Sequence, residues 1–185
     1  MVDFIGMQKR LPEFQAILQV YAVIAVIFSG WTIVAFLRKI PSWLLTLNMG
    51  EIFILFSYSM FVNLVESLIV LLLLLVACVL LPPRVFRDDF GARGAILSIG
   101  VLGSLMLYLR MMMQFGMENV SRLLIPPLVV LLLTAFFLAF SSKLRVARFV
   151  RSAALWISDR LVVFLFILIP LFVVLSVYVI FRNII

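Results

Sequence analysis

SWLLTLNMGEIFILFSYSMFVNLVESLIVLLLLLVACVLL, residues 42–81, is the stretch that decides the fold. Its only charged residues are Glu51 and Glu66, and Pro82 and Pro83 follow it directly. A bilayer core about 30 Å thick is crossed by about 20 apolar residues in a helix. As one helix with a rise of 1.5 Å per residue, this stretch would be about 60 Å long. It therefore contains either two membrane spans or one span with a long approach.

The composition of the whole chain supports a membrane assignment. Of its 185 residues, 66% are hydrophobic, and the mean hydropathy is +1.33. Soluble domains are about 45–50% apolar. We therefore predict an all-α fold, a polytopic helical membrane protein in which residues 1–185 form a single integral membrane domain.

Polar residues in the central stretch recur with helical periodicity. At 100° per residue they share an arc of about 140°; they are Asn48, Glu51, Tyr58, Ser59, Asn63 and Glu66. This alignment favours one continuous helix, with an amphipathic approach over residues 43–58 and a crossing over residues 59–81. A hairpin at residues 61–65 is the alternative, but Asn63 is the only turn-forming residue there.

The remaining spans follow from the apolar runs on either side. They are expected at residues 15–37, 95–113, 123–140 and 161–181, with Pro41 breaking the helix after the first. Together with the central crossing they make five transmembrane helices, and the hairpin alternative makes six. Residues 141–160 are too basic to cross and predict an amphipathic surface helix lying on the membrane.

Basic residues give the orientation. Lys143, Arg145, Arg148 and Arg151 lie in the most basic loop, which we predict to be cytoplasmic and to bind anionic lipid headgroups. With five spans the amino terminus is also cytoplasmic and the carboxyl terminus lies outside, in the cell membrane. The five-span and six-span arrangements both place ten Lys and Arg inside and five outside, so charge does not distinguish them.

The chain lacks the residues that several classes of function need. The chain has no histidine and one cysteine, Cys78, so we predict no metal site, no cofactor and no histidine-dependent catalysis. We also expect no nucleic-acid partner, because the net charge of +7 is explained by basic residues flanking the spans. These observations predict that the protein is not an enzyme.

The candidate functional residues are polar groups within apolar segments: Glu66, Asn63, Glu51 and Arg110. A carboxylate at the centre of a span costs roughly 2.5–3.5 kcal/mol on insertion scales, which calls for a partner or a function. Glu66 is predicted to be the polar centre of the bundle, with Asn63 one turn before it and Arg110 at a similar depth as its partner.

Two functions fit these features. The first is a non-enzymatic accessory or assembly subunit of a membrane complex, which would contact other membrane subunits or a second copy of itself. The second is a small oligomeric transporter or channel component, in which Glu66 and Asn63 line the path.

Overall fold

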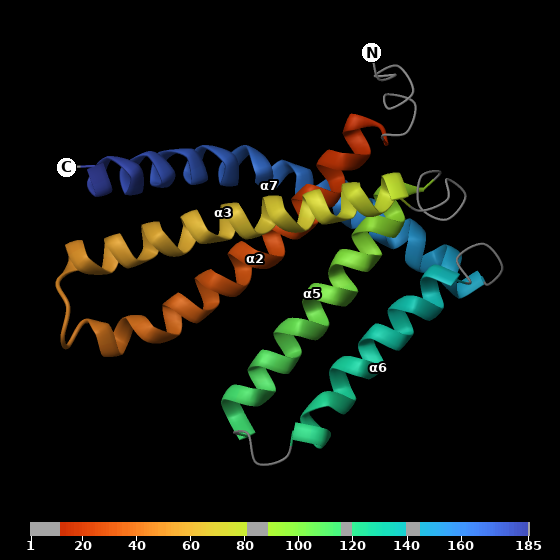
Figure 1. Ribbon diagram of the computed structural model, residues 1–185, viewed down its shortest axis with the longest axis horizontal. Helices are drawn as coiled ribbons and strands as arrows, with labels where there is room; N and C mark the ends of the chain where they lie inside the picture. The colour runs from red at the N-terminus through yellow and green to blue at the C-terminus, as the bar shows by residue number, and fades with distance from the viewer. Residues whose placement is uncertain (1–11, 81–88, 116–119, 140–144, 185) are drawn as a thin grey trace.

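A computed structural model describes residues 12–80, 89–115, 120–139 and 145–184 (Figure 1). Five helices and no strands make up this part of the chain, which confirms the all-α prediction. In the numbering of Figure 1 they are α2 (Phe14–Trp43), α3 (Met49–Leu80), α5 (Phe90–Phe115), α6 (Val120–Ala139) and α7 (Arg145–Ile184).

Four of these helices are long and apolar enough to cross a membrane, over Phe14–Trp43, Met49–Leu80, Phe90–Gln114 and Phe149–Ile184. The apolar part of α6, Leu123–Ala139, is shorter and would extend about 26 Å at 1.5 Å per residue. Length and composition therefore indicate a membrane location, with four candidate spans and a shorter fifth apolar helix.

The central stretch forms one helix. α3 runs unbroken from Met49 to Leu80, so the hairpin at residues 61–65 that six spans would require is absent from the structure. The expected approach helix does not begin at residue 43, because α2 continues through Pro41 to Trp43. Leu44 N–H still donates to the Ile40 carbonyl at 2.9 Å, and the break comes in the turn before Met49.

Reciprocal hydrogen bonds start α3 at this point. The Glu51 backbone N–H donates to Asn48 Oδ1 at 2.9 Å, and the Asn48 backbone N–H donates to Glu51 Oε2 at 2.9 Å. This is the pattern of a capping box, which satisfies two backbone donors at a helix amino terminus.

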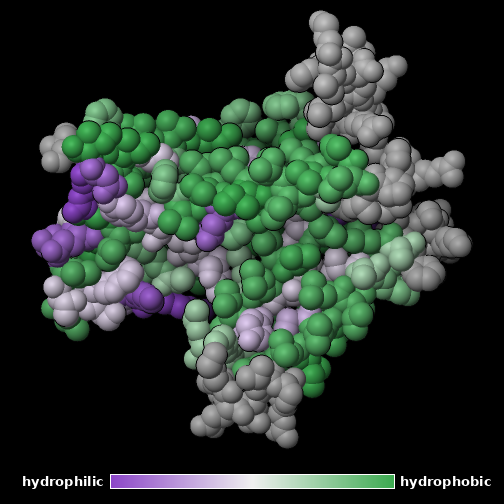
Figure 2. All heavy atoms as spheres, viewed as in Figure 1, coloured by the Kyte–Doolittle hydropathy of each residue, from purple (hydrophilic) through white to green (hydrophobic). Residues whose placement is uncertain are grey.

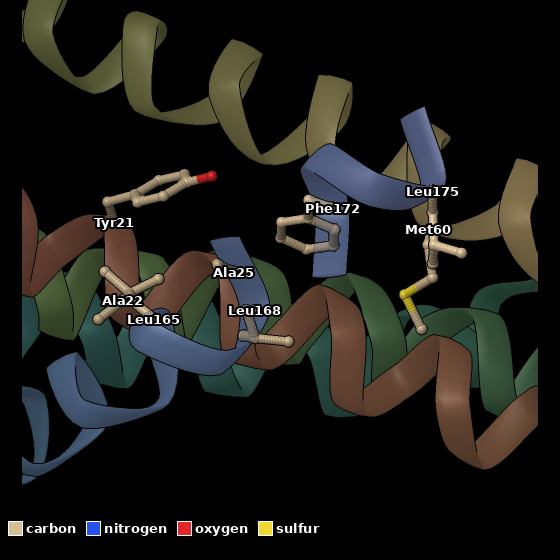
Figure 3. Close-up of a cluster of buried hydrophobic side chains, with 8 residues drawn as sticks. All are labelled: Tyr21, Ala22, Ala25, Met60, Leu165, Leu168, Phe172 and Leu175. Carbon is tan, nitrogen blue, oxygen red and sulfur yellow. The ribbon is translucent and has the colours of Figure 1, made fainter. Parts of the chain in front are cut away.

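α2 is the helix on which α3, α5 and α7 assemble. Residues 20–25 are each at most 9% exposed, so this segment is covered on all sides, by α3, α5 and α7. Figure 3 shows one of the resulting clusters, the three-helix cluster, in which side chains from α2, α3 and α7 meet. Its members are Tyr21, Ala22, Ala25, Met60, Leu165, Leu168, Phe172 and Leu175.

Away from this crossing the helices diverge into two limbs (Figure 1). α2, α3 and α7 form one limb, and α5 and α6 form the other. The small residues at the start of α5 allow the limbs to meet closely, as small residues do where helices pack in lipid. A Cβ atom at Gly94 would lie 2.8 Å from Val20 Cγ2, so α2 and α5 are in near-backbone contact there.

α7 differs from the prediction of a surface helix followed by a separate span. It is one helix over Arg145–Ile184, and Ala154 and Ser158 are buried in its first half. Ala154 packs with Val23 of α2 and Ala95 of α5. One face of the predicted surface segment is therefore occupied by protein.

Candidate functional site

A groove of about 470 Å³ lies between the second half of α2 and the first half of α3. We call it the α2–α3 groove, and it contains two of the four predicted polar candidates. Its lining residues are Trp31, Thr32, Ala35, Phe36, Lys39, Trp43, Leu55, Tyr58, Ser59, Val62, Asn63 and Glu66.

Asn63 joins the two walls of this groove. It is 4% exposed and its Oδ1 accepts a hydrogen bond from Thr32 Oγ1 at 2.9 Å. Its Nδ2 lies 3.8 Å from Met60 Sδ, a weak acceptor. The carboxamide predicted as an ion-path group is thus engaged in holding α3 to α2, an interhelical hydrogen bond of a kind common in membrane bundles.

Glu66 lies on the flank of the helix, not at the centre of the bundle. The buried side of α3 is formed by Ile52, Ser57, Met60, Asn63, Ser67, Leu74 and Cys78. Glu66 follows Asn63 by three residues, which turns it about 60° from that side chain. Glu66 is exposed and faces the α2–α3 groove, and within the described ranges its carboxylate has no hydrogen bond or ion pair.

Three exposed α3 side chains next to Glu66 are apolar. Val62, Val65 and Ile69 are between 40% and 51% exposed, and Glu66 lies near the middle of α3 along its length. A carboxylate is therefore displayed at mid-length of α3, with exposed apolar side chains next to it. In a helix that crosses a membrane, this is the position at which exposure to lipid is most costly.

Glu51 has a different role. It closes the capping box with Asn48, outside the α2–α3 groove lining. The sequence signal for this was present as Asn48-x-x-Glu51 ahead of an apolar run, and a capping box explains why an acidic residue stands there.

Arg110 lines a second groove, of about 460 Å³, between α2 and α5. This α2–α5 groove also contains Arg38 and Lys39, and it shares Trp31, Ala35 and Lys39 with the α2–α3 groove. Glu66 and Arg110 thus face different grooves, and no ion pair joins them in the structure as described.

The predicted lipid-binding residues are only partly within the described chain. Lys143 lies outside it, as do the side chains of Arg145 and Arg148, so lipid binding by these three stays a prediction. Arg151 forms an ion pair with Asp89, which directly precedes α5. Of the four predicted lipid-binding residues, at least Arg151 contacts the bundle.

A second polar contact lies between α2 and α7 in the same region. Gln19 Nε2 donates to Asp159 Oδ1 at 2.6 Å, and a Cβ at Gly91 would lie 2.6 Å from Gln19 Oε1. Sequence reasoning assigned no partner to Gln19, Asp159 or Asp89, because their partners are distant in the chain. Together these contacts tie the starts of α2 and α5 to α7.

We expect the Asp89–Arg151 pair to contribute modestly to stability. Its side chains are 21% and 39% exposed, so solvent screens the attraction, and exposed pairs are worth about 0.2–1 kcal/mol. Asp89→Asn and Arg151→Gln should each lower the free energy of unfolding by about 1 kcal/mol in detergent micelles.

Arg182→Gln, at the exposed end of α7, is the control for the Asp89–Arg151 pair. An exchanged pair, Asp89→Arg with Arg151→Asp, should recover part of the loss, and a simple sum of two losses would contradict the coupling.

Comparison with known proteins found no relative of this chain. No family model, no curated protein and no solved structure matches it. Among the described residues, no group of three or more Cys, Asp or Glu side chains is placed to hold a metal ion. The arguments for function therefore rest on the geometry of the two grooves.

Proposed function

We propose that this protein is a non-enzymatic membrane subunit that binds a partner helix in the α2–α3 groove. The observation that carries the proposal is the exposed carboxylate of Glu66 at mid-length of an apolar helix. Such a group needs a donor or a wet environment in the bilayer. A neighbouring transmembrane helix that brings a hydroxyl, amide or basic side chain into the groove would supply the donor.

The remainder of the groove suits such a helix. Trp31, Val62 and Leu55 give it apolar walls, and Tyr58 and Ser59 add hydroxyl groups. Helix association in lipid depends on close packing and interhelical hydrogen bonds, since lipid removes most of the hydrophobic driving force. A groove with one unsatisfied carboxylate provides a surface for packing and a polar group that makes the contact selective.

The proposal includes a topology. α2, α5 and α7 run in one direction and α3 and α6 run back (Figure 1), which is compatible with five crossings. The basic segment at residues 141–160 would then be cytoplasmic and the carboxyl terminus outside, as the positive-inside rule favours. Lys143, Arg145 and Arg148 would contact anionic headgroups of the inner leaflet of the cell membrane.

Photocrosslinking in the native membrane tests the partner directly. A benzophenone amino acid at Val62, in the groove, should give a protein adduct of one defined mass. The same probe at Phe166, which is 77% exposed on α7, should give adducts with lipid alone. Glu66→Leu should reduce the protein adduct at Val62 at least about tenfold, which corresponds to about 1.4 kcal/mol.

The Glu66→Leu variant and the mass of the adduct determine how the crosslinking result is interpreted. Glu66→Leu removes a charge from an apolar surface, so it should not destabilise the monomer. An adduct of twice the chain mass would identify the partner as a second copy. Lipid adducts alone at Val62, or a protein adduct indifferent to Glu66, would contradict the proposal.

A conduit is the second candidate, because the polar groups of the groove are arranged along its length. Lys39 and Tyr58 stand nearer the α2–α3 turn, and Ser59, Asn63 and Glu66 follow along α3. A transporter would use this line of groups to bring an ion or proton to mid-membrane. Purified protein in liposomes distinguishes the two: a conduit predicts ion or proton flux that Glu66→Gln abolishes, and a subunit predicts no flux.

A further inference from the structure

The α2–α5 groove gathers three basic side chains from two helices. Arg38 and Lys39 come from the end of α2 and Arg110 from the second half of α5, and all three are exposed. Figure 2 shows hydrophilic atoms gathered toward the end where α2 and α3 join, on a face that is otherwise largely hydrophobic. In the part of the chain that the structure describes, none of the three is paired with a carboxylate.

The remaining lining of the same groove is mostly apolar. Ile27, Val34 and Met106 line it, and Gly30 leaves one side without a side chain. A Cβ atom at Gly30 would meet nothing within 4 Å, so the space there is open. Methionine side chains such as Met106 and Met113 adapt to flexible apolar ligands.

Along α2 the groove therefore has an apolar end near Ile27 and a cationic end at Arg38 and Lys39. Gln114 adds a neutral amide beside the three cations. The volume of the α2–α5 groove, about 460 Å³, falls within the usual range of ligand sites, about 300–1,000 Å³. An apolar surface beside a cluster of cations complements an anionic phospholipid, whose headgroup carries a phosphate and whose acyl chains are apolar. Lys39 Nζ also lies 5.8 Å from the centroid of the Trp43 ring.

We propose that the α2–α5 groove is a specific site for one anionic phospholipid of the bilayer. Arg38, Lys39 and Arg110 bind its phosphate, and the guanidinium groups of the two arginines match phosphate oxygens as paired donors. One of its acyl chains lies past Gly30 toward Ile27, between α2 and α5. The lipid thereby supplies contacts that the protein lacks where α2 and α5 diverge.

Native mass spectrometry of the full chain in detergent tests the site, with phosphatidylglycerol and phosphatidylcholine as probes. The native chain should bind one phosphatidylglycerol in clear preference to phosphatidylcholine. Arg38→Gln with Arg110→Gln should weaken phosphatidylglycerol binding by about 30-fold, since each basic residue near an anionic surface contributes about fivefold. These two arginines line only the α2–α5 groove, so the partner site in the α2–α3 groove is left intact.

The control removes the same charge elsewhere. Arg160→Gln with Arg182→Gln alters two exposed cations on α7, away from the groove lining, and should leave the preference for phosphatidylglycerol unchanged. Equal loss in the two double variants would show that general charge attraction accounts for binding, and would overturn the proposal. So would equal binding of the two lipids by the native chain.

A second pair of variants tests the acyl-chain position without altering charge. Gly30→Leu projects a side chain into the groove and should lower occupancy by phosphatidylglycerol at least tenfold. Gly103→Leu is the matched control, because a Cβ at Gly103 also meets nothing within 4 Å and Gly103 is not in the groove lining. Unchanged lipid binding by Gly30→Leu would overturn the proposal even if the arginine variants failed to fold.

Discussion

Gly100→Leu is expected to detach α6 from α5 and to lower the free energy of unfolding by about 3 kcal/mol, at the upper end of the cost of overpacking. A Cβ atom at Gly100 would overlap the Thr134 side chain and lie 2.8 Å from its Cβ. Thr134 is buried and its hydroxyl donates to the Val130 carbonyl at 2.7 Å. α6 packs almost entirely on α5, so it has little other surface to hold it once this contact opens.

Gly103→Leu provides the control for this prediction. Gly103 lies three residues further along α5, and a Cβ there meets nothing within 4 Å. Replacing it should leave stability unchanged or raise it by up to about 1 kcal/mol, because glycine is a poor helix former. Titration with a denaturing detergent in mixed micelles measures both. Gly100→Ala with Thr134→Ala should lose less than Gly100→Ala alone, and equal losses at positions 100 and 103 would contradict this packing.

Helical periodicity predicted the central element correctly. Six polar residues from Asn48 to Glu66 share one arc, with Ser57 outside it, and an arc of that kind has meaning only if the chain does not turn back within it. The structure has the single helix Met49–Leu80 that this requires. Counting basic residues could not distinguish five spans from six, because both arrangements place ten Lys and Arg inside and five outside.

The boundaries of the elements were less predictable. Pro41 was expected to end the first helix, but a proline near a carboxyl terminus removes a single backbone donor, and α2 continues to Trp43. The basic segment was expected to form a separate element, but Ala154 and Ser158 give it a small-residue face that packs in the bundle. In the structure it forms the first part of α7 and contacts α2 and α5. These contacts involve distant parts of the chain, so the local sequence does not reveal them.

The sequence predicted which residues belong to the candidate site, but not the direction in which their side chains point. Periodicity indicates which residues share a face of α3, but not which neighbour covers that face. Asn63 lies against Thr32 and Glu66 faces the groove, a difference of about 60° around the helix. The α2–α5 groove was missed for a related reason, since Arg38 and Arg110 meet only after two distant helices pack.

Phe172→Ala should be the most destabilising substitution in the three-helix cluster. Phe172 is 1% exposed and lies among side chains of α2, α3 and α7 (Figure 3). Replacing a buried phenylalanine by alanine costs about 3–5 kcal/mol in water-soluble proteins, through lost transfer free energy and the cavity. In a bilayer the transfer part is small because lipid is also apolar. We therefore expect about 3 kcal/mol, nearly all from lost packing.

Phe166→Ala measures the opposite case on the same helix. Phe166 is 77% exposed, and in a bilayer its ring would contact lipid in the folded and unfolded states alike. Its loss should change the free energy of unfolding by less than about 0.5 kcal/mol, as for surface positions in general. Both variants are measured by denaturing-detergent titration in mixed micelles. If Phe166→Ala cost as much as Phe172→Ala, the outer face of α7 would have to be covered by protein and not by lipid. The partner surface would then extend beyond the α2–α3 groove, and Phe166 could not serve as the lipid-facing control for crosslinking.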